Sequence, residues 1–214
     1  MTSYPVAVEN YVKVIYAHTE WQPDPITPLV LAQRLGLAAS SVTEMVKKLA
    51  GLGLVDHRPY GAVTLTADGT RLALTMVRRH RLIETWLVDQ FGYTWDEVHD
   101  EAEVLEHALS DRMLGLIDQQ LGFPVSDPHG DPIPSADLSI IVPDASLLAS
   151  VREGRVVRIS DRDPSLLREL ASAGVDIGAS LRVLSASGDL VVEVDGREAT
   201  LDGAVLDAVW VATP

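Results

Sequence analysis

Apolar residues recur at helical spacing along the first fifty positions of the chain. Between residues 7 and 19 they fall at steps of three and four, which predicts an amphipathic helix. A threonine and a proline at 27–28 predict the start of a second helix, which Gly36 ends. Ser41 and Glu44 have the spacing of a capping box, so we expect a third helix to begin at Ser41.

Two short apolar runs follow the third helix. Residues 54–58 and 62–66 predict strands joined by a Pro-Tyr-Gly turn. Three helices and a hairpin in this order are typical of a winged helix-turn-helix. We expect residues 1–73 to form such a DNA-binding domain.

The helical pattern returns at greater length after the hairpin. It predicts one helix from about Ala67 to Phe91 and another from Trp95 to about Leu121. These helices exceed what the small first domain needs, so we assign residues 74–140 to a helical dimerisation domain. Residues 122–147 are rich in proline, glycine and aspartate and predict a linker, with the domain boundary itself at 141–150.

The last part of the chain has the pattern of a small β-barrel over residues 151–214. Gly, Asp and Ser turns separate its short apolar runs, and a brief helix is predicted near residues 165–171. The runs are 155–159, 181–184, 190–194, 199–201 and 209–211. The predicted fold class is therefore mainly α with small β.

Composition narrows the class of protein. Hydrophobic residues make up 47 %, enough for real cores, and the absence of cysteine excludes disulfides and thiolate metal sites. Since the chain has no run of 18 apolar residues and no signal segment, we expect a cytoplasmic protein without a membrane partner.

The net charge of −14 argues against nucleic-acid binding until its distribution is considered. Residues 1–79 carry a net charge of +2, while the remaining residues carry −16. The acidic part can attract cations, and the slightly positive charge of the first domain is compatible with DNA binding.

Histidines and carboxylates share helix faces in the acidic part. His80 and Glu84 are one turn apart, and a second run places its members at steps of four, three and one. That second run is His99, Glu103, Glu106 and His107. These hard nitrogen and oxygen donors suit a six-coordinate divalent cation such as Mn²⁺, Fe²⁺ or Co²⁺, and binding should weaken at low pH, where the imidazoles are protonated. The alternative is a solvated acidic face, which we prefer for Asp100 and Glu101.

The third helix would present its first turns to DNA. Hydroxyl groups there suit phosphates and thymine methyls, and lysines supply nonspecific attraction. The candidate DNA-binding residues are Ser40, Ser41, Thr43, Glu44, Lys47, Lys48 and Arg58. The alternative is a helix pair used only for packing.

A catalytic set is not apparent, because the sequence has no nucleophile elbow and no glycine-rich phosphate loop. We therefore expect a protein that is not an enzyme and has no small-molecule substrate. A metallohydrolase is the alternative from a different class, but it leaves the winged helix unexplained.

These features together resemble the diphtheria toxin repressor family of metal-dependent regulators. The resemblance rests on the winged helix and on the runs 77–84 and 98–107, and it extends through Gly-Asp-Pro-Ile-Pro at 130–134. It implies an SH3-like (FeoA-like) barrel at the C-terminus. Within the family the chain is most similar to the manganese-responsive branch of actinobacterial type.

Two positions support that branch. Iron-responsive members carry a methionine on the first helix and a cysteine three residues before the Glu-His pair, where this chain has Asn10 and Glu103. The manganese branch has the glutamate. Asn10 replaces its usual aspartate, and the amide carbonyl can still ligate Mn²⁺ with one less negative charge.

The resemblance also implies ligand sets and partners. The primary metal set is Asn10, His80, Glu103, Glu106 and His107. The secondary set is Glu84, His99, Asp127, His129 and an acid of the last domain such as Asp163. The implied protein is a homodimeric repressor of manganese uptake genes, bound to a palindromic operator and activated by Mn²⁺, with Fe²⁺, Co²⁺ or Zn²⁺ also bound in vitro. An iron- or zinc-responsive regulator is the alternative within the family.

Glu103→Cys should shift metal preference toward Fe²⁺ or Zn²⁺, because it replaces a hard oxygen donor with a soft sulfur donor. Competitive metal titration of the purified protein measures this preference. An unchanged order of affinities would contradict the argument from ligand hardness.

Overall fold

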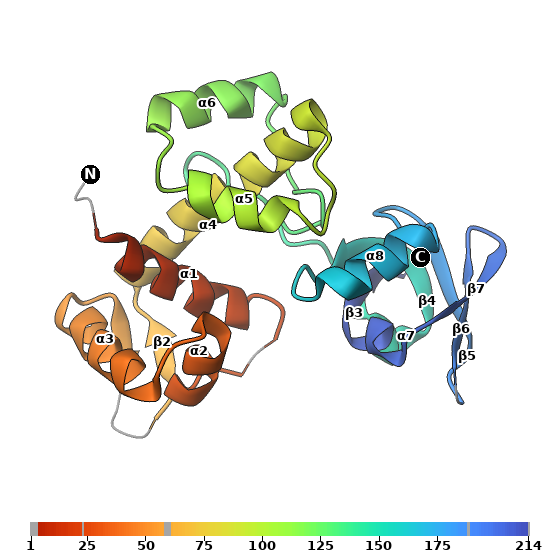
Figure 1. The fold of residues 1–214 in the computed structure, drawn as a ribbon, viewed down its shortest axis with the longest axis horizontal. Helices are drawn as coiled ribbons and strands as arrows, with labels where there is room; N and C mark the ends of the chain where they lie inside the picture. The colour runs from red at the N-terminus through yellow and green to blue at the C-terminus, as the bar shows by residue number, and fades with distance from the viewer. Residues whose placement is uncertain (1–3, 23, 58–60, 188, 214) are drawn as a thin grey trace. The chain divides into compact units, whose positions relative to one another are not determined.

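A computed structural model describes residues 4–22, 24–57, 61–187 and 189–213 (Figure 1). The chain divides into two compact units. One unit is Met1–Arg79 with Ala136–Leu138, and the other is His80–Ser135 with Ser139–Pro214.

The first unit contains the predicted winged helix-turn-helix. Its elements are α1 (Val6–Thr19), α2 (Pro28–Leu35), α3 (Ala39–Gly51), β1 (Val55–His57) and β2 (Val63–Leu65). The two strands pair antiparallel, and the helices enclose a core of mostly aliphatic residues with Tyr11 among them. Thr27 Oγ1 accepts a hydrogen bond from Val30 N at 3.3 Å, and Gly36 ends α2 with a φ of 64°. Both predicted caps of α2 are confirmed.

The predicted capping box of α3 is wrong. The helix begins at Ala39, and its N-cap is Ala38, which makes no side-chain capping bond. Ser41 lies inside the first turn, three residues after the N-cap position. Its hydroxyl therefore cannot cap the first backbone N–H groups of the helix. Glu44 instead pairs with Lys47, with 2.8 Å between Oε1 and Nζ.

The second unit begins within a long helix and continues with two short ones. They are α4 (Ala67–Phe91), α5 (Val98–Leu105) and α6 (Asp111–Gln120). The bounds of α4 are those predicted, but the single helix expected over 95–121 is broken. Ser110 is extended and its Oγ accepts from Met113 N at 3.2 Å, so it caps a new helix. The histidine-carboxylate run therefore ends in a turn after α5.

The predicted linker contains a buried turn. Asp127, His129 and Asp131 are all buried, and Asp127 Oδ1 accepts from His129 N at 2.8 Å and Asp131 N at 2.9 Å. The linker prediction over 122–147 is therefore wrong for residues 127–134, all of which except Pro128 are buried. Proline, glycine and aspartate mark a tight turn here, because a side-chain acceptor and a residue with positive φ, Gly130, both favour one.

The last part of the second unit is a six-stranded antiparallel sheet in the order β3-β8-β4-β5-β6-β7. Its strands are β3 (Ser146–Leu147), β4 (Glu153–Ile159), β5 (Ser180–Ser185), β6 (Leu190–Val194), β7 (Arg197–Leu201) and β8 (Val209–Ala212). Three short helices accompany them, α7 (Leu148–Val151), α8 (Pro164–Ser172) and the 3₁₀ helix η1 (Gly203–Asp207). All five predicted strands and the predicted helix are present. The sheet begins at Ser146, inside the segment expected as a linker at 141–150.

A β-bulge interrupts β4. Val156 pairs with Val211 and Arg158 pairs with Trp210, so β4 advances by two residues while β8 advances by one. Val156 and Ile159 consequently both enter the core, and Arg158 shares the outer face with Trp210.

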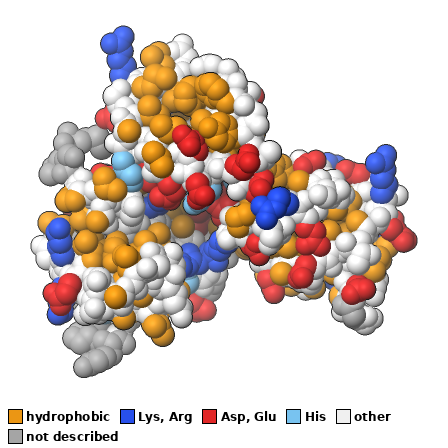
Figure 2. Space-filling model, viewed as in Figure 1, with side chains coloured by type: hydrophobic (Ala, Val, Ile, Leu, Met, Phe, Trp, Pro, Cys, Tyr) orange, Lys and Arg blue, Asp and Glu red, His pale blue; other side chains and the backbone are white. Residues whose placement is uncertain are grey.

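The surface over α5 and α6 is apolar. Figure 2 shows hydrophobic side chains gathered there, and Val104 and Leu116 are 69 % and 52 % exposed. Within the described part of the chain, no helix is both long and apolar enough to cross a membrane.

Gly69→Ala should destabilise the protein by about 1–3 kcal/mol, because the new Cβ would lie 1.9 Å from the carbonyl oxygen of Leu54. Gly51→Ala is the matched control, since nothing lies within 4 Å of its Cβ position, and it should be neutral or slightly stabilising. Urea unfolding measures both. Equal effects of the two substitutions would contradict the tight contact at Gly69.

Candidate metal centre

His80 lies at the centre of the histidine-carboxylate cluster. It is buried on α4, and each of its ring nitrogens faces a carboxylate. Nδ1 is 2.6 Å from Glu106 Oε2, and Nε2 is 2.9 Å from Glu84 Oε1. His80 therefore connects the end of α5 with the next turn of its own helix.

The structure brings together four of the five predicted primary residues. Glu106 is fully buried, and its Oε1 is 3.2 Å from His107 Nε2. Glu103 joins them through a group in which donor atoms of His80, His99 and Glu103 lie within 4.8 Å of one another. Asn10 belongs to α1 in the other compact unit, so its place in this set stays a prediction.

A second group forms around Glu84, which is 1 % exposed. Donor atoms of Glu84, Asp127 and His129 lie within 4.8 Å of one another, and all three residues are buried. Glu84, His99 and Asp161 meet the same distance criterion. His99 Nδ1 is 3.2 Å from Glu84 Oε1 and 3.5 Å from Asp161 Oδ2.

The acid from the last domain in this group is Asp161, while Asp163 has a different place. Asp163 Oδ1 accepts from Ser165 N at 2.9 Å and from Leu166 N at 3.3 Å, which caps α8. The sequence held a usable signal, because an aspartate directly before a proline is a typical helix start. Assigning Asp163 to the cap would have directed the prediction to another acid of the last domain, and the tertiary contacts identify that acid as Asp161.

His129 is oriented as a metal-binding histidine would be. Its Nε2 is 3.1 Å from the carbonyl oxygen of Trp95, which requires that nitrogen to donate. In a neutral ring Nδ1 then carries the lone pair, and this atom is buried without a hydrogen-bond partner among the described residues. Metal-binding histidines commonly donate their second nitrogen to a carbonyl in this way. The chemistry of this group therefore fits a cation.

Electrostatics in the second group favour added positive charge. Burial raises the pKa of Asp127 well above its usual range, and the charges of Asp131 and Glu84 raise it further, against a smaller opposing effect of Arg81. Burial also raises the pKa of Glu84, but the charge and hydrogen bond of His80, with the hydrogen bond of His99 and the charge of His129, outweigh it and hold that pKa well below normal. Crowded carboxylates of this kind are stabilised by a divalent cation.

The candidate DNA-binding residues lie on the exposed face of α3. The opposite face of α3 is buried through Val42, Val46 and Leu49. The exposed candidates are Ser40, Ser41, Thr43, Glu44, Lys47 and Lys48. Arg58 lies outside the described residues.

Three family models match consecutive parts of the chain. The iron-dependent repressor N-terminal DNA-binding domain matches residues 6–63. The iron-dependent repressor metal-binding and dimerisation domain matches residues 66–135, and the FeoA domain matches residues 146–213.

Full-length relatives agree with these matches. The diphtheria toxin repressor of Corynebacterium efficiens is 30 % identical over 95 % of this chain and 94 % of that protein. A solved manganese-dependent transcriptional repressor in complex with manganese is 50 % identical, with a TM-score of 0.91 over 97 % of this chain and 100 % of that one. The manganese regulator SloR is 33 % identical, with a TM-score of 0.79 over 97 % and 98 %.

Proposed function

We propose that this chain, which belongs to the iron-dependent repressor family of metal-dependent transcriptional repressors, responds to manganese. The observation that carries the proposal is the chemistry of the two donor groups, which offer imidazole nitrogen and carboxylate oxygen and no sulfur. Carboxylate oxygen is a donor that suits Mn²⁺, and the lack of sulfur leaves no donor that would select a softer ion. Two similar solved structures are named for manganese, one as a manganese-dependent transcriptional repressor and one as the manganese regulator SloR. Their names support the same ion for this chain.

The primary site in this proposal consists of His80, Glu103, Glu106 and His107 with Asn10. A divalent cation supplies the positive charge that their clustered carboxylates need. Because Asn10 belongs to the DNA-binding unit, its ligation would fix that unit against the dimerisation domain. Coupling of this kind is typically worth about 1–3 kcal/mol, and by reciprocity bound DNA would tighten metal binding equally.

The second site in this proposal consists of Glu84, His99, Asp127, His129 and Asp161, which form two donor groups that share Glu84. Its residues come from α4, from α5, from the buried turn and from the segment after β4. Four separate parts of the second unit would thus supply donors for one cation.

DNA recognition in this proposal uses two copies of α3. The apolar surface over α5 and α6 would join the copies in a homodimer, and a palindromic operator would match the symmetry of the dimer. Genes for manganese uptake are the expected targets.

Mn²⁺ should increase binding to DNA upstream of the protein's own gene by about 5- to 150-fold. Glu103→Ala or His107→Ala should abolish this increase, because each removes a ligand. A gel shift with Mn²⁺, Fe²⁺, Zn²⁺ or chelator measures it, with the exposed barrel variant Glu198→Ala as the control. Equal binding in Mn²⁺ and chelator would contradict metal activation, and a stronger response to Fe²⁺ or Zn²⁺ would replace manganese.

Asp161→Ala should lower the amount of Mn²⁺ bound per subunit, because it removes a donor of the second site. Asp163→Ala should leave that amount unchanged and only weaken the cap of α8. Calorimetric titration of both variants distinguishes the two acids. The reverse pattern would assign Asp163 to the site.

A further inference from the structure

A buried ion pair joins the turn at 127–134 to the barrel. Arg158 Nε is 2.6 Å from Asp131 Oδ1, and each side chain is 6 % exposed. The guanidinium carbon of Arg158 also lies 4.1 Å from the ring centroid of Trp210. On the other side, Arg81 Nη2 of α4 is 3.7 Å from the same oxygen of Asp131. Asp131 thus lies between an arginine of the metal-bearing helix and an arginine of the barrel.

The bulge in β4 makes this contact possible. In a regular strand Arg158 would lie on the same side as Val156, whose side chain is in the core. The extra residue at Val157 moves Arg158 to the outer face, beside Trp210 and against the turn.

The backbone of the turn contacts β4 at the same place. A Cβ on Gly130 would lie 2.0 Å from the carbonyl oxygen of Val157, so only glycine fits there. The carbonyl oxygen of His129 accepts a hydrogen bond from Ile159 N at 2.8 Å. Three successive residues, 129–131, therefore contact three successive residues of β4, 157–159.

Stability alone does not account for a buried ion pair, because well-packed apolar residues in its place are often as stable or more so. What this pair adds is a fixed position of the turn relative to the barrel. Asp127 and His129, whose side chains lie with Glu84, belong to the turn that Asp131 and Arg158 hold.

We propose that Asp131 and Arg158 are positioning residues for the second metal site, through which the barrel holds the Asp127–His129 turn in place for metal binding. This inference rests on the proposed second site. Loss of a residue that orients metal ligands typically costs about 10- to 100-fold in metal affinity. We expect that loss at the second site and no change at the primary site.

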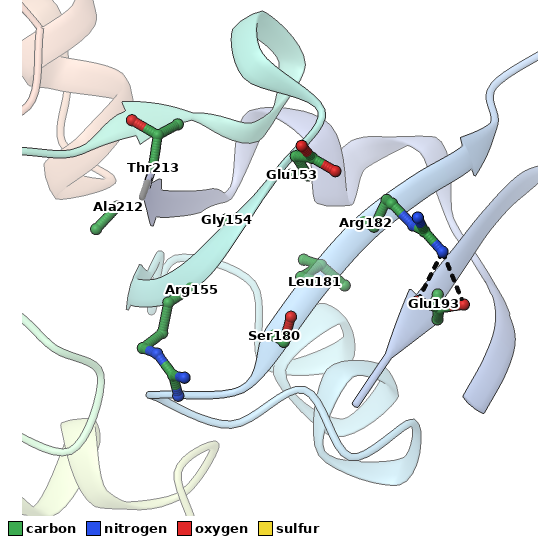
Figure 3. A pocket seen from close by; sticks show the side chains of 9 residues that line it. All are labelled: Glu153, Gly154, Arg155, Ser180, Leu181, Arg182, Glu193, Ala212 and Thr213. Carbon is green, nitrogen blue, oxygen red and sulfur yellow. Dashed lines mark hydrogen bonds and ion pairs between the residues drawn. The ribbon is translucent and has the colours of Figure 1, made fainter. Parts of the chain in front are cut away.

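The test uses the full chain, freed of metal and titrated with Mn²⁺ in a calorimeter. Arg158→Met and Asp131→Asn should each weaken one class of Mn²⁺ site about 10- to 100-fold. Arg182→Met is the matched control, because Arg182 belongs to the same barrel and pairs with Glu193 at 2.9 Å on an exposed face (Figure 3). It should change neither class of site.

The double variant Asp131→Asn with Arg158→Met should bind Mn²⁺ at the second site no more weakly than the single variant with the lower affinity. We expect this because the two residues act as one unit. Near-ultraviolet circular dichroism in chelator verifies folding, and Arg158→Lys replaces Arg158→Met if the latter does not fold. Wild-type affinity at the second site in a folded Arg158 variant would overturn the inference, as would equal weakening of both classes of site. If the wild-type chain itself binds only one Mn²⁺, the proposed second site fails and the inference fails with it.

Discussion

The second unit is organised around the burial of carboxylate groups that require positive charge. Glu84 is almost fully buried in the middle of α4, and a buried carboxylate is costly unless it is paired. His80 and His99 contact it, and donor atoms of Asp127 and His129 lie within 4.8 Å of its carboxylate. Imidazoles and arginines balance the acidic residues that meet here from distant parts of the sequence, and a bound cation would add to that balance.

This constraint gives the barrel a role beyond packing. Asp161 comes from the segment after β4, and the barrel also presses Val157 against the turn that carries Asp127 and His129. The FeoA domain and the helical domain therefore share one polar interface in the second unit. The resemblance to the family placed an acid of the last domain near the metal, and the structure adds the backbone contacts that hold the turn there.

Periodicity predicted most of the elements because each helix and strand buries one face. It placed α4 at its observed bounds and located five strands of the barrel. It missed the break before Ser110, because the apolar pattern continues through this point. The break is visible only in the extended backbone of Ser110 and in the hydrogen bond by which its side chain caps α6. It also gave the turn at 127–134 as a linker, because composition does not distinguish an exposed flexible segment from a buried turn. The helix faces of the candidate site were predictable from spacing, whereas Asp161 and Asp131 depend on tertiary contacts that no local pattern encodes.

The bulge at Val157 has a consequence for the surface of the barrel. Arg158 reaches the turn that carries Asp127 and His129 because β4 has one residue more than β8 between the pairs Val156–Val211 and Arg158–Trp210. One extra residue in a strand is enough to turn the next position from the core face to the outer face. The barrel can therefore present a charged side chain to its neighbour while Val156 and Ile159 on either side stay in the core.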